Sequence, residues 1–294
     1  MRIVAAGVSG FIGTRLVAAL HQQGHQVVQL VRRQPNGLDE VRWDPDAGDF
    51  DDDVLVGADA VINLCGVGVG DKRWTDEYRS LIVTSRVKPT ALIAAGCATH
   101  RVPVLLNASA IGIYGHRGEE ELTEQSTPGD DFFGHVCRDW ESATRAAAEA
   151  GTRVVNLRTG LVLGREGGLL SQLSVLTKLF LGGRLASGRQ WNSWIAADDE
   201  VAAILFLLTA DVSGPVNLTA PNPVRNSELA TAIGRALGRP TPWAIPAFAL
   251  RLVVGDFAEE IIHGQQVLPG KLTEAGFTFR WPELTDALAA EVKR

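Results

Sequence analysis

The chain opens on Met1-Arg2-Ile3-Val4-Ala5-Ala6-Gly7-Val8-Ser9-Gly10-Phe11-Ile12-Gly13. A short apolar strand over 2–6 runs directly into Gly-x-x-Gly-x-x-Gly, and an amphipathic helix follows over 11–23. Strand, glycine turn and helix in this order are typical of the phosphate-binding turn of a dinucleotide-binding unit. The alternative is an ordinary α/β turn that holds no ligand.

Each glycine of this turn has its own expected task. Gly7 permits the tight turn after the strand, Gly10 lets the backbone approach a pyrophosphate, and Gly13 lets the helix pack closely on the sheet. Because the helix begins near Phe11, its free N–H groups and positive end would hold the phosphates. The predicted cofactor-binding residues of the turn are Gly7, Ser9, Gly10, Phe11, Ile12 and Gly13.

Strands and helices alternate along the first half of the chain. This rhythm predicts an α/β fold with a Rossmann-like, doubly wound parallel sheet. The expected strands are 2–6, 26–31, 41–43, 59–64, 102–108 and 153–158, and the expected helices are 11–23, 75–97 and 131–150.

The rhythm changes after residue 160, where prolines and loops become more frequent. Helices are expected over 168–182, 199–209, 227–238 and 246–262, with a strand at 216–218. We therefore predict a dinucleotide-binding domain over 1–165, to which 196–220 returns. A smaller α+β lobe on the substrate side would comprise 166–195 and 221–294.

Composition excludes several classes of function. A net charge of −6 argues against nucleic acid or an anionic membrane as the main partner. The three cysteines are far apart, so reduced thiols in a cytoplasm fit better than a disulfide framework, and no Cys/His spacing predicts a metal site. No leader is visible, and no apolar stretch approaches the length of a membrane span. Monomer and homodimer both stay open.

The end of the second strand indicates which cofactor is preferred. An acidic residue there would bind the ribose 2′-hydroxyl of NAD. This chain has Arg32 and Arg33 instead, and a guanidinium suits the 2′-phosphate of NADP. We therefore predict NADP(H), the alternative being two solvated surface arginines.

At this point the chain resembles an atypical extended short-chain dehydrogenase/reductase. More narrowly, it resembles the NAD(P)-dependent epimerase/dehydratase-like group that is named after a cell-division inhibitor and carries a C-terminal domain of unknown function. The similarity runs nearly end to end. Its motifs are the glycine turn, Asn63-Leu64-Cys65-Gly66, Arg73-Trp74-Thr75, Ser85-Arg86-Val87, Asn107-Ala108-Ser109-Ala110, Tyr114-Gly115, Trp140-Glu141, Arg158-Thr159-Gly160, Gly188-Arg189-Gln190, Ser193-Trp194-Ile195, Pro221-Asn222-Pro223 and Pro269-Gly270-Lys271-Leu272. The resemblance implies further cofactor-binding residues: Leu64, Cys65, Gly66, Ser85 and Arg158.

The chain departs from the general reductase pattern at its catalytic pair. Neither of its two tyrosines is followed four positions later by lysine. With Glu141 as the anchor of the register, the usual tyrosine falls on Phe133 and the usual lysine on Cys137. Phe133 transfers no proton, and Cys137 supplies no ammonium. Ala196-Ala197 also replaces a histidine that is common in relatives.

Two residues remain as candidates for chemistry. Carbonyl reduction needs a hydrogen-bond donor within reach of the developing alkoxide. Ser109 matches the serine that polarises the carbonyl in relatives, although it could equally be a strand-end serine bonded to backbone. Tyr114 is a candidate for a displaced acid, or a packed wall residue.

The predicted substrate contacts lie on two loops. Arg73 and Trp74 follow a glycine-rich loop that leaves the fourth strand toward the crevice, where an arginine could clamp an anionic group and a tryptophan could stack. Both could instead anchor the loop. Gln190 and Trp194 would close the crevice from the smaller lobe, and the alternative for Trp194 is a core position.

Two functions are compatible with these residues. The first is an NADP-dependent oxidoreductase or epimerase with a non-standard proton donor, acting on a small polar substrate. The second is a protein that binds NADP(H) without turnover, as a sensor or a partner-docking module.

Overall fold

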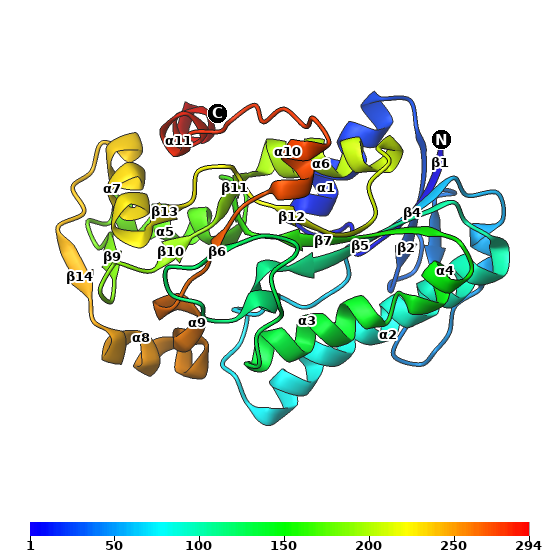
Figure 1. Cartoon of the computed structure of the whole chain (residues 1–294), viewed down its shortest axis with the longest axis horizontal. Coiled ribbons are helices and arrows are strands. Elements are labelled where there is room, and N and C mark those ends of the chain that lie inside the picture. The colour runs from blue at the N-terminus through cyan, green and yellow to red at the C-terminus, as the bar shows by residue number, and fades with distance from the viewer. Residues whose placement is uncertain (294) are drawn as a thin grey trace.

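The computed structural model describes residues 1–293 and contains a seven-stranded parallel sheet (Figure 1). The strand order β12-β7-β5-β4-β1-β2-β3 confirms the predicted Rossmann-like, doubly wound architecture. The strands are β1 (Arg2–Ala6), β2 (Gln26–Val31), β3 (Glu40–Arg42), β4 (Ala60–Asn63), β5 (Val104–Ala110), β7 (Arg153–Thr159) and β12 (Gly214–Leu218).

Two helical layers cover the sheet (Figure 1). On one face, α1 (Phe11–Gln22) and α6 (Ala197–Thr209) bury Leu16, Leu20 and Leu207 against strand residues such as Ile62. On the other face, α2 (Asp76–His100) and α4 (Arg145–Glu149) pack on the opposite side chains of the same strands. Strand residues buried on both faces explain the continuous apolar runs in the sequence.

The strand order reverses between β1 and β4, which are both paired in parallel register. In open α/β sheets, ligands bind at the carboxyl ends of the strands beside this reversal. The glycine turn after β1 and the segment after β4 therefore border the expected ligand crevice.

A row of buried asparagines fixes the carboxyl ends of three neighbouring strands. Asn63, Asn107 and Asn156 lie opposite one another in the register of β4, β5 and β7. Asn63 Nδ2 donates to Asn107 Oδ1 at 2.8 Å, and Asn107 Nδ2 donates to Asn156 Oδ1 at 3.3 Å. Because buried amides are costly unless paired, this row specifies one register for the strands that carry the site.

The smaller C-terminal region is built from short elements around a separate core that includes Trp194. Its strands are β8 (Leu161–Leu163), β9 (Gly183–Leu185), β10 (Trp191–Asn192), β11 (Trp194–Ala196), β13 (Val224–Arg225), β14 (Trp243–Ile245) and β15 (Gln266–Val267). Its helices are α5 (Gly168–Lys178), α7 (Asn226–Leu237), α8 (Ala247–Val254), η3 (Gly255–Phe257), α9 (Ala258–Ile262), α10 (Gly270–Glu274) and α11 (Leu284–Lys293). The elements η1 (Asp52–Leu55), η2 (Ile111–Tyr114) and β6 (Glu121–Leu122) lie in loops of the first half.

Two long helices that the sequence predicts are broken in the structure. The predicted helix 131–150 divides into α3 (Phe132–Ser142) and α4, where Thr144 Oγ1 donates to the Glu141 carbonyl. The predicted helix 246–262 divides at Gly255, whose φ of +63° no continuing helix can adopt. A positive φ is open to glycine at little cost, so this break is set by one residue.

One helix passes a test for membrane spans that rests on length and composition alone. Among the described residues, α2 is long and apolar enough to cross a membrane by length and composition, with a mean hydropathy of 1.2 in its best window. In this structure 44% of that window is buried inside the protein. Core helices pass the same test, and α2 packs as one against the sheet.

Candidate nucleotide-binding and active site

The glycine turn has the geometry that close backbone approach requires. Gly7 has a φ of +72°, and a Cβ there would lie 2.5 Å from the backbone N of Cys65. A Cβ on Gly13 would lie 2.3 Å from the Cα of Val8, so this glycine allows the turn to fold onto its own helix. A Cβ on Gly10 would meet nothing within 4 Å, which leaves open space beside the helix N-terminus.

No side chain caps the N-terminus of α1. Its first N–H groups therefore remain available to a ligand anion. The ring of Phe11 does not face this space, because a Cβ on Gly164 would lie 2.2 Å from its Cζ. Phe11 thus packs beneath the loop that follows β8 and contributes its backbone rather than its ring.

The two arginines after β2 have different partners. Arg33 forms an ion pair with Glu40 of β3, at 2.5 and 2.7 Å for its two terminal nitrogens. The side-chain hydrogen bond from Arg33 lowers the pKa of Glu40. Arg32 is exposed and forms no hydrogen bond or ion pair with any residue in 1–293. Of the predicted pair, Arg32 is therefore the one whose guanidinium is available.

Ser109 and Arg158 both bind the same carboxylate. Ser109 Oγ donates to Glu141 Oε1 at 2.7 Å, and Arg158 donates to both Glu141 oxygens at 2.8 and 2.9 Å. Arg158 is 5% exposed, so this charged pair is nearly dry. The predicted cofactor contact Arg158 is thus occupied by Glu141, and Ser109 is positioned by it.

Tyr114 belongs to the interior and not to the crevice surface. Its ring is fully buried. Its hydroxyl donates to Asn217 Oδ1 at 2.6 Å and accepts from Arg158 at 3.0 Å. Burial raises the pKa of this phenol. The structure therefore favours a packed wall residue, and we do not retain Tyr114 as the displaced acid.

An aromatic cluster occupies the position of the missing tyrosine. Phe133 packs against Trp74 at 5.5 Å between ring centroids, and Phe132 and Phe257 contact the same tryptophan at 5.2 and 5.5 Å. The Nε1 of Trp74 donates to the Val69 carbonyl at 2.8 Å. Trp74 thus anchors its own loop and covers Phe133, and it presents little surface to a substrate.

The residue at the lysine position is inert. Cys137 is 1% exposed and lies among apolar neighbours. Burial raises the pKa of its thiol to about 12. Because the thiolate is the reactive form, Cys137 fills space at neutral pH and performs no nucleophilic chemistry.

The remaining predicted substrate contacts are divided between crevice and core. Arg73 is exposed, and its side chain lies against Gly255 of the C-terminal region. Gln190 is buried; its Nε2 donates to the carbonyls of Leu185 and Ile261, whereas its Oε1 has no partner in the described part of the chain. Trp194 is fully buried and donates to the Asn222 carbonyl, which corrects its expected place at the crevice.

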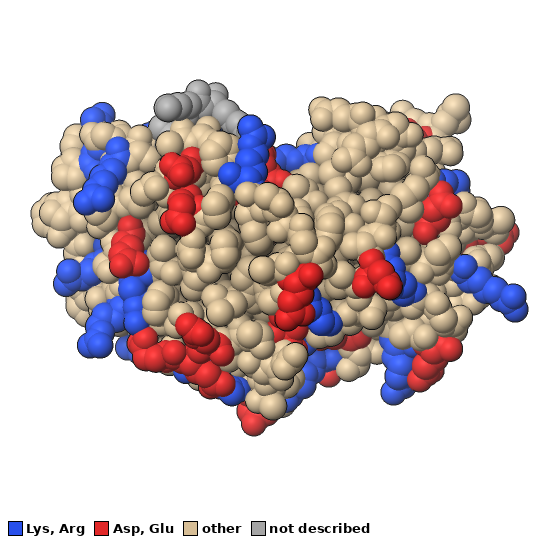
Figure 2. Space-filling view, turned by 45° about the horizontal axis from the view of Figure 1, so that its top comes forward, with Lys and Arg blue, Asp and Glu red and all other residues tan. Residues whose placement is uncertain are grey.

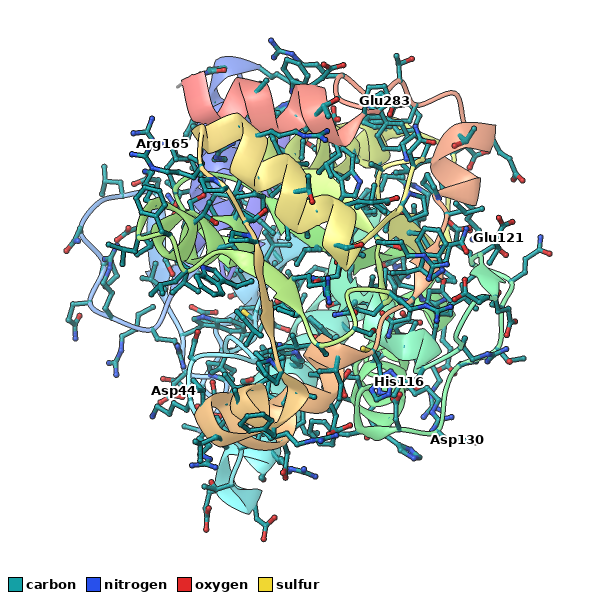
Figure 3. The ribbon with its side chains drawn as sticks, turned by 90° about the vertical axis from the view of Figure 1, so that its left-hand side faces the viewer. Asp44, His116, Glu121, Asp130, Arg165 and Glu283 are labelled. Carbon is teal, nitrogen blue, oxygen red and sulfur yellow. The ribbon has the colours of Figure 1, made fainter. Side chains whose placement is uncertain are left out.

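A cluster of titratable side chains was missed by sequence reasoning. The rings of His116 and His263 lie 4.4 Å apart, and His116 Nε2 is 3.9 Å from Asp131 Oδ2. Figure 3 shows His116 where the segment after η2 approaches the α9 region. Burial raises the pKa of the neighbouring Glu260 to about 7, and Asp131 and Glu259 add repulsion. Only the Tyr114-Gly115 motif just before His116 signalled this site.

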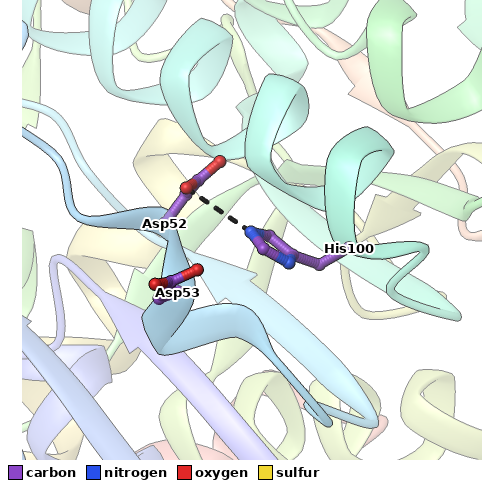
Figure 4. A group of neighbouring side chains, drawn as sticks. All are labelled: Asp52, Asp53 and His100. Atoms are coloured by element: carbon purple, nitrogen blue, oxygen red, sulfur yellow. Dashed lines mark ion pairs between the residues drawn. The ribbon is translucent and has the colours of Figure 1, made fainter.

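One group of side chains in the described residues has the spacing of metal ligands. Asp52, Asp53 and His100 offer atoms within 4.8 Å of one another (Figure 4). His100 Nε2 lies 3.4 Å from Asp52 Oδ1, which is the distance of an ordinary ion pair. The group lies where the C-terminal end of α2 meets η1, before β4, and so at the amino ends of the strands, whereas the glycine turn lies at their carboxyl ends.

Two models of known protein families match this chain. The model of the NAD dependent epimerase/dehydratase family matches residues 3–219, and the model of a domain of unknown function, DUF1731, matches residues 245–291. The chain therefore belongs to the NAD dependent epimerase/dehydratase family.

Individual relatives are similar to this chain over nearly its whole length. Epimerase family protein ML0860 of Mycobacterium leprae is 43% identical over 99% of this chain and 96% of its own. The chloroplastic epimerase family protein SDR39U1 homolog of Arabidopsis thaliana is 36% identical over 99% of this chain and 86% of its own. The crystal structure of human epimerase family protein SDR39U1 (isoform 2) with NADPH is 31% identical and has a TM-score of 0.91, with both chains covered completely.

Proposed function

We propose that this chain is an NADP(H)-dependent oxidoreductase or epimerase of the atypical extended short-chain dehydrogenase/reductase type, acting on a small polar substrate. The observation that carries the cofactor assignment is the exposed Arg32 at the end of β2, which has no hydrogen-bond or ion-pair partner among the described residues 1–293. A guanidinium at this place suits a 2′-phosphate. The NADPH bound in the human relative supports the same choice.

The proposal of a polar substrate rests on the side-chain amide of Gln190. Its Oε1 is buried and accepts no hydrogen bond within the described residues, and a buried acceptor without a donor is costly. A hydroxyl or amide of a substrate would satisfy it. Arg73, exposed at the edge of the loop after β4, supplies a cation for an anionic substrate group.

The proton donor belongs to the His116–Glu260 cluster. Phe133 cannot replace the absent tyrosine, and the aromatic rings around it offer no acid. Because the pKa of Glu260 is about 7, both its protonated and its ionised form are populated at neutral pH, and it can donate a proton as well as accept one. His116 and His263 stack beside Asp131 and Glu259, the two carboxylates whose repulsion adds to the raised pKa of Glu260.

A second candidate is an NADP(H) sensor without turnover. The observation that favours it is the apolar cover of Phe133 together with the inert thiol of Cys137. Such a protein would bind NADPH and change its conformation or its partner, without losing hydride.

Location and partners follow from the surface and the thiols. All three cysteines are free, which agrees with a reducing cytoplasm as the proposed location. Acidic and basic residues are interspersed on the face in Figure 2, where no continuous basic patch is visible. We therefore propose small molecules as partners, with neither nucleic acid nor membrane, for a monomer and a homodimer alike.

Fluorescence titration with NADPH and NADH tests the cofactor assignment. Arg32→Ala should raise the Kd for NADPH about tenfold or more, since a hydrogen bond to a charged group contributes about 1.5–3 kcal/mol. Affinity for NADH should stay the same. Arg33→Ala is the matched control, because Arg33 already binds Glu40. Equal affinities for the two cofactors, unchanged in Arg32→Ala, would remove the NADP(H) assignment.

Turnover distinguishes the two candidate functions. The enzyme should oxidise NADPH with at least one member of a panel of polar carbonyl compounds, and Ser109→Ala should abolish this oxidation. Tight NADPH binding with no hydride loss across the panel would leave the sensor as the function.

A further inference from the structure

Arg86 is a buried cation that lacks a carboxylate partner. It is 9% exposed. Its Nη1 donates to the Ile82 carbonyl at 2.9 Å, its Nη2 donates to the Val67 carbonyl at 3.0 Å, and its guanidinium lies 5.0 Å from the ring of Trp140. All three partners are uncharged. Within residues 1–293 Arg86 forms no ion pair, and its Nε donates no hydrogen bond.

Such a cation is expensive unless something else compensates it. The other buried arginine beside the crevice, Arg158, is neutralised by two hydrogen bonds to Glu141. Arg86 has no equivalent carboxylate, and burial lowers its pKa. A ligand with oxygen acceptors would supply the missing compensation.

The guanidinium lies at the expected cofactor crevice. A Cβ on Gly66 would be 3.1 Å from the Cζ of Arg86. Gly66 directly follows the Leu64–Cys65 backbone on which Gly7 of the phosphate turn packs. On its other side, the charge of Arg86 acts on the thiol of Cys137, the residue at the lysine position. Arg86 thus lies between the phosphate turn and the helix that has lost the lysine.

We propose that Arg86 of α2 binds the hydroxyl oxygens of the nicotinamide-side ribose of NADP(H), and so provides the cation that Cys137 cannot. This inference rests on the proposed function. It assigns the two ends of the cofactor to two arginines from different elements, Arg32 after β2 for the 2′-phosphate and Arg86 of α2 for the distant ribose.

Two probes distinguish the two ends of the cofactor. NADPH contains both, whereas adenosine 2′,5′-bisphosphate carries the 2′-phosphate but no nicotinamide-side ribose. Arg86→Met should raise the Kd for NADPH about tenfold or more and leave the Kd for the bisphosphate unchanged. Arg32→Ala should weaken both. Arg86→Lys, which keeps the cation, should recover most of the affinity for NADPH.

Controls separate ligand binding from support of the loop. Tyr78→Phe removes another contact with the same loop, the hydrogen bond from the Tyr78 hydroxyl to the Gly68 carbonyl, without changing charge. It should leave NADPH affinity within about threefold of wild type. Thermal unfolding of every variant shows which ones fold, and Arg86→Gln, which keeps hydrogen-bond donors but removes the charge, replaces Arg86→Met if that variant does not fold.

The outcomes are distinct. Equal losses for NADPH and the bisphosphate in an Arg86 variant, or a loss of NADPH affinity in Tyr78→Phe as large as that in Arg86→Met, would assign Arg86 to the structure of the loop and overturn the inference. A wild-type protein that binds neither probe would instead overturn the proposed function itself.

Discussion

Glu141 determines what the side chains around it can do. Its carboxylate accepts hydrogen bonds from the hydroxyl of Ser109 and from the guanidinium of Arg158. Arg158 also donates to the hydroxyl of Tyr114, which links Glu141 to that tyrosine. Ser109 therefore keeps its orientation without help from backbone. The same network removes Tyr114 from the crevice, so the proton donor of the proposed enzyme is sought outside it.

The first prediction concerns that source of protons. Glu260→Gln should reduce NADPH turnover at pH 7 at least about tenfold, because a carboxyl that exchanges its proton near neutrality becomes an amide that does not. The Kd for NADPH should not change. Steady-state kinetics over a pH series, with any substrate found in the panel, provides the measurement.

Glu149→Gln is the control for this prediction. The side chain of Glu149 on α4 is 70% exposed and pairs with Arg145, outside the His116–Glu260 cluster. We expect this variant to stay within about threefold of wild type, since surface ion pairs contribute little. If both variants retain full turnover, the proton donor lies elsewhere.

At the scale of elements, the phosphate turn combines a steric requirement with an open space. Gly7→Ala should destabilise the fold by about 1–3 kcal/mol or more, because its φ is +72° and the added methyl would collide with the backbone after β4. Gly10→Ala should fold nearly normally, since nothing lies within 4 Å of the new methyl.

For NADPH affinity we expect the opposite order: among folded molecules, Gly10→Ala is the variant that loses more. Gly10→Ala should weaken NADPH binding about tenfold or more, because the methyl occupies the space into which the pyrophosphate would enter. Urea unfolding and fluorescence titration measure the two effects separately. Normal NADPH affinity in Gly10→Ala would show that the phosphates bind elsewhere.

The elements that sequence reasoning predicted are those with local causes. The strands of the main sheet follow from continuous apolar runs, and the glycine turn follows from spacing within thirteen residues. The break at Gly255 and the division of α3 from α4 were missed, because helix periodicity continues across both points.

The candidate site residues could be predicted from the sequence only where their cause is local. Gly7, Gly10 and Arg32 are marked by their distance from a strand end. The stacking of His116 on His263 joins residues far apart in sequence, and the buried charge of Arg86 depends on Trp140 and on the loop at Val67. Such neighbours are set by packing, which no pattern within one segment reveals.

The whole molecule carries one buried acid that affects its stability. Glu200 is 1% exposed; its Oε1 accepts from Thr159 Oγ1 at 2.8 Å, and its Oε2 has no partner among the described residues. Burial raises its pKa from the ordinary value of 4.5 to about 8. The folded protein therefore retains a proton that the unfolded chain releases.

This acid makes the free energy of unfolding depend on pH with a definite sign. The contribution is complete below the unfolded pKa of 4.5 and is lost as pH rises to about 8. The free energy of unfolding of the wild type should fall by a few kcal/mol across that range because of this group, and in Glu200→Gln that fall should be absent. The difference in unfolding free energy between wild type and variant should therefore change with pH. Urea unfolding at several pH values measures it.

Glu149→Gln is the control, because the side chain of Glu149 is 70% exposed. Its unfolding free energy should follow the wild-type pH profile throughout. A Glu200→Gln profile parallel to wild type would contradict the assignment of the buried proton.

The order of strands also determines when during synthesis the sheet is finished. β12 pairs with β7 at the edge of the sheet, yet it leaves the ribosome only after α5 and the short strands that precede it. Until then a nascent chain that ends near residue 165 exposes the outer edge of β7, with its unpaired N–H and C=O groups, and lacks α6 over one face. The first 165 residues made alone should therefore aggregate more readily than the full chain.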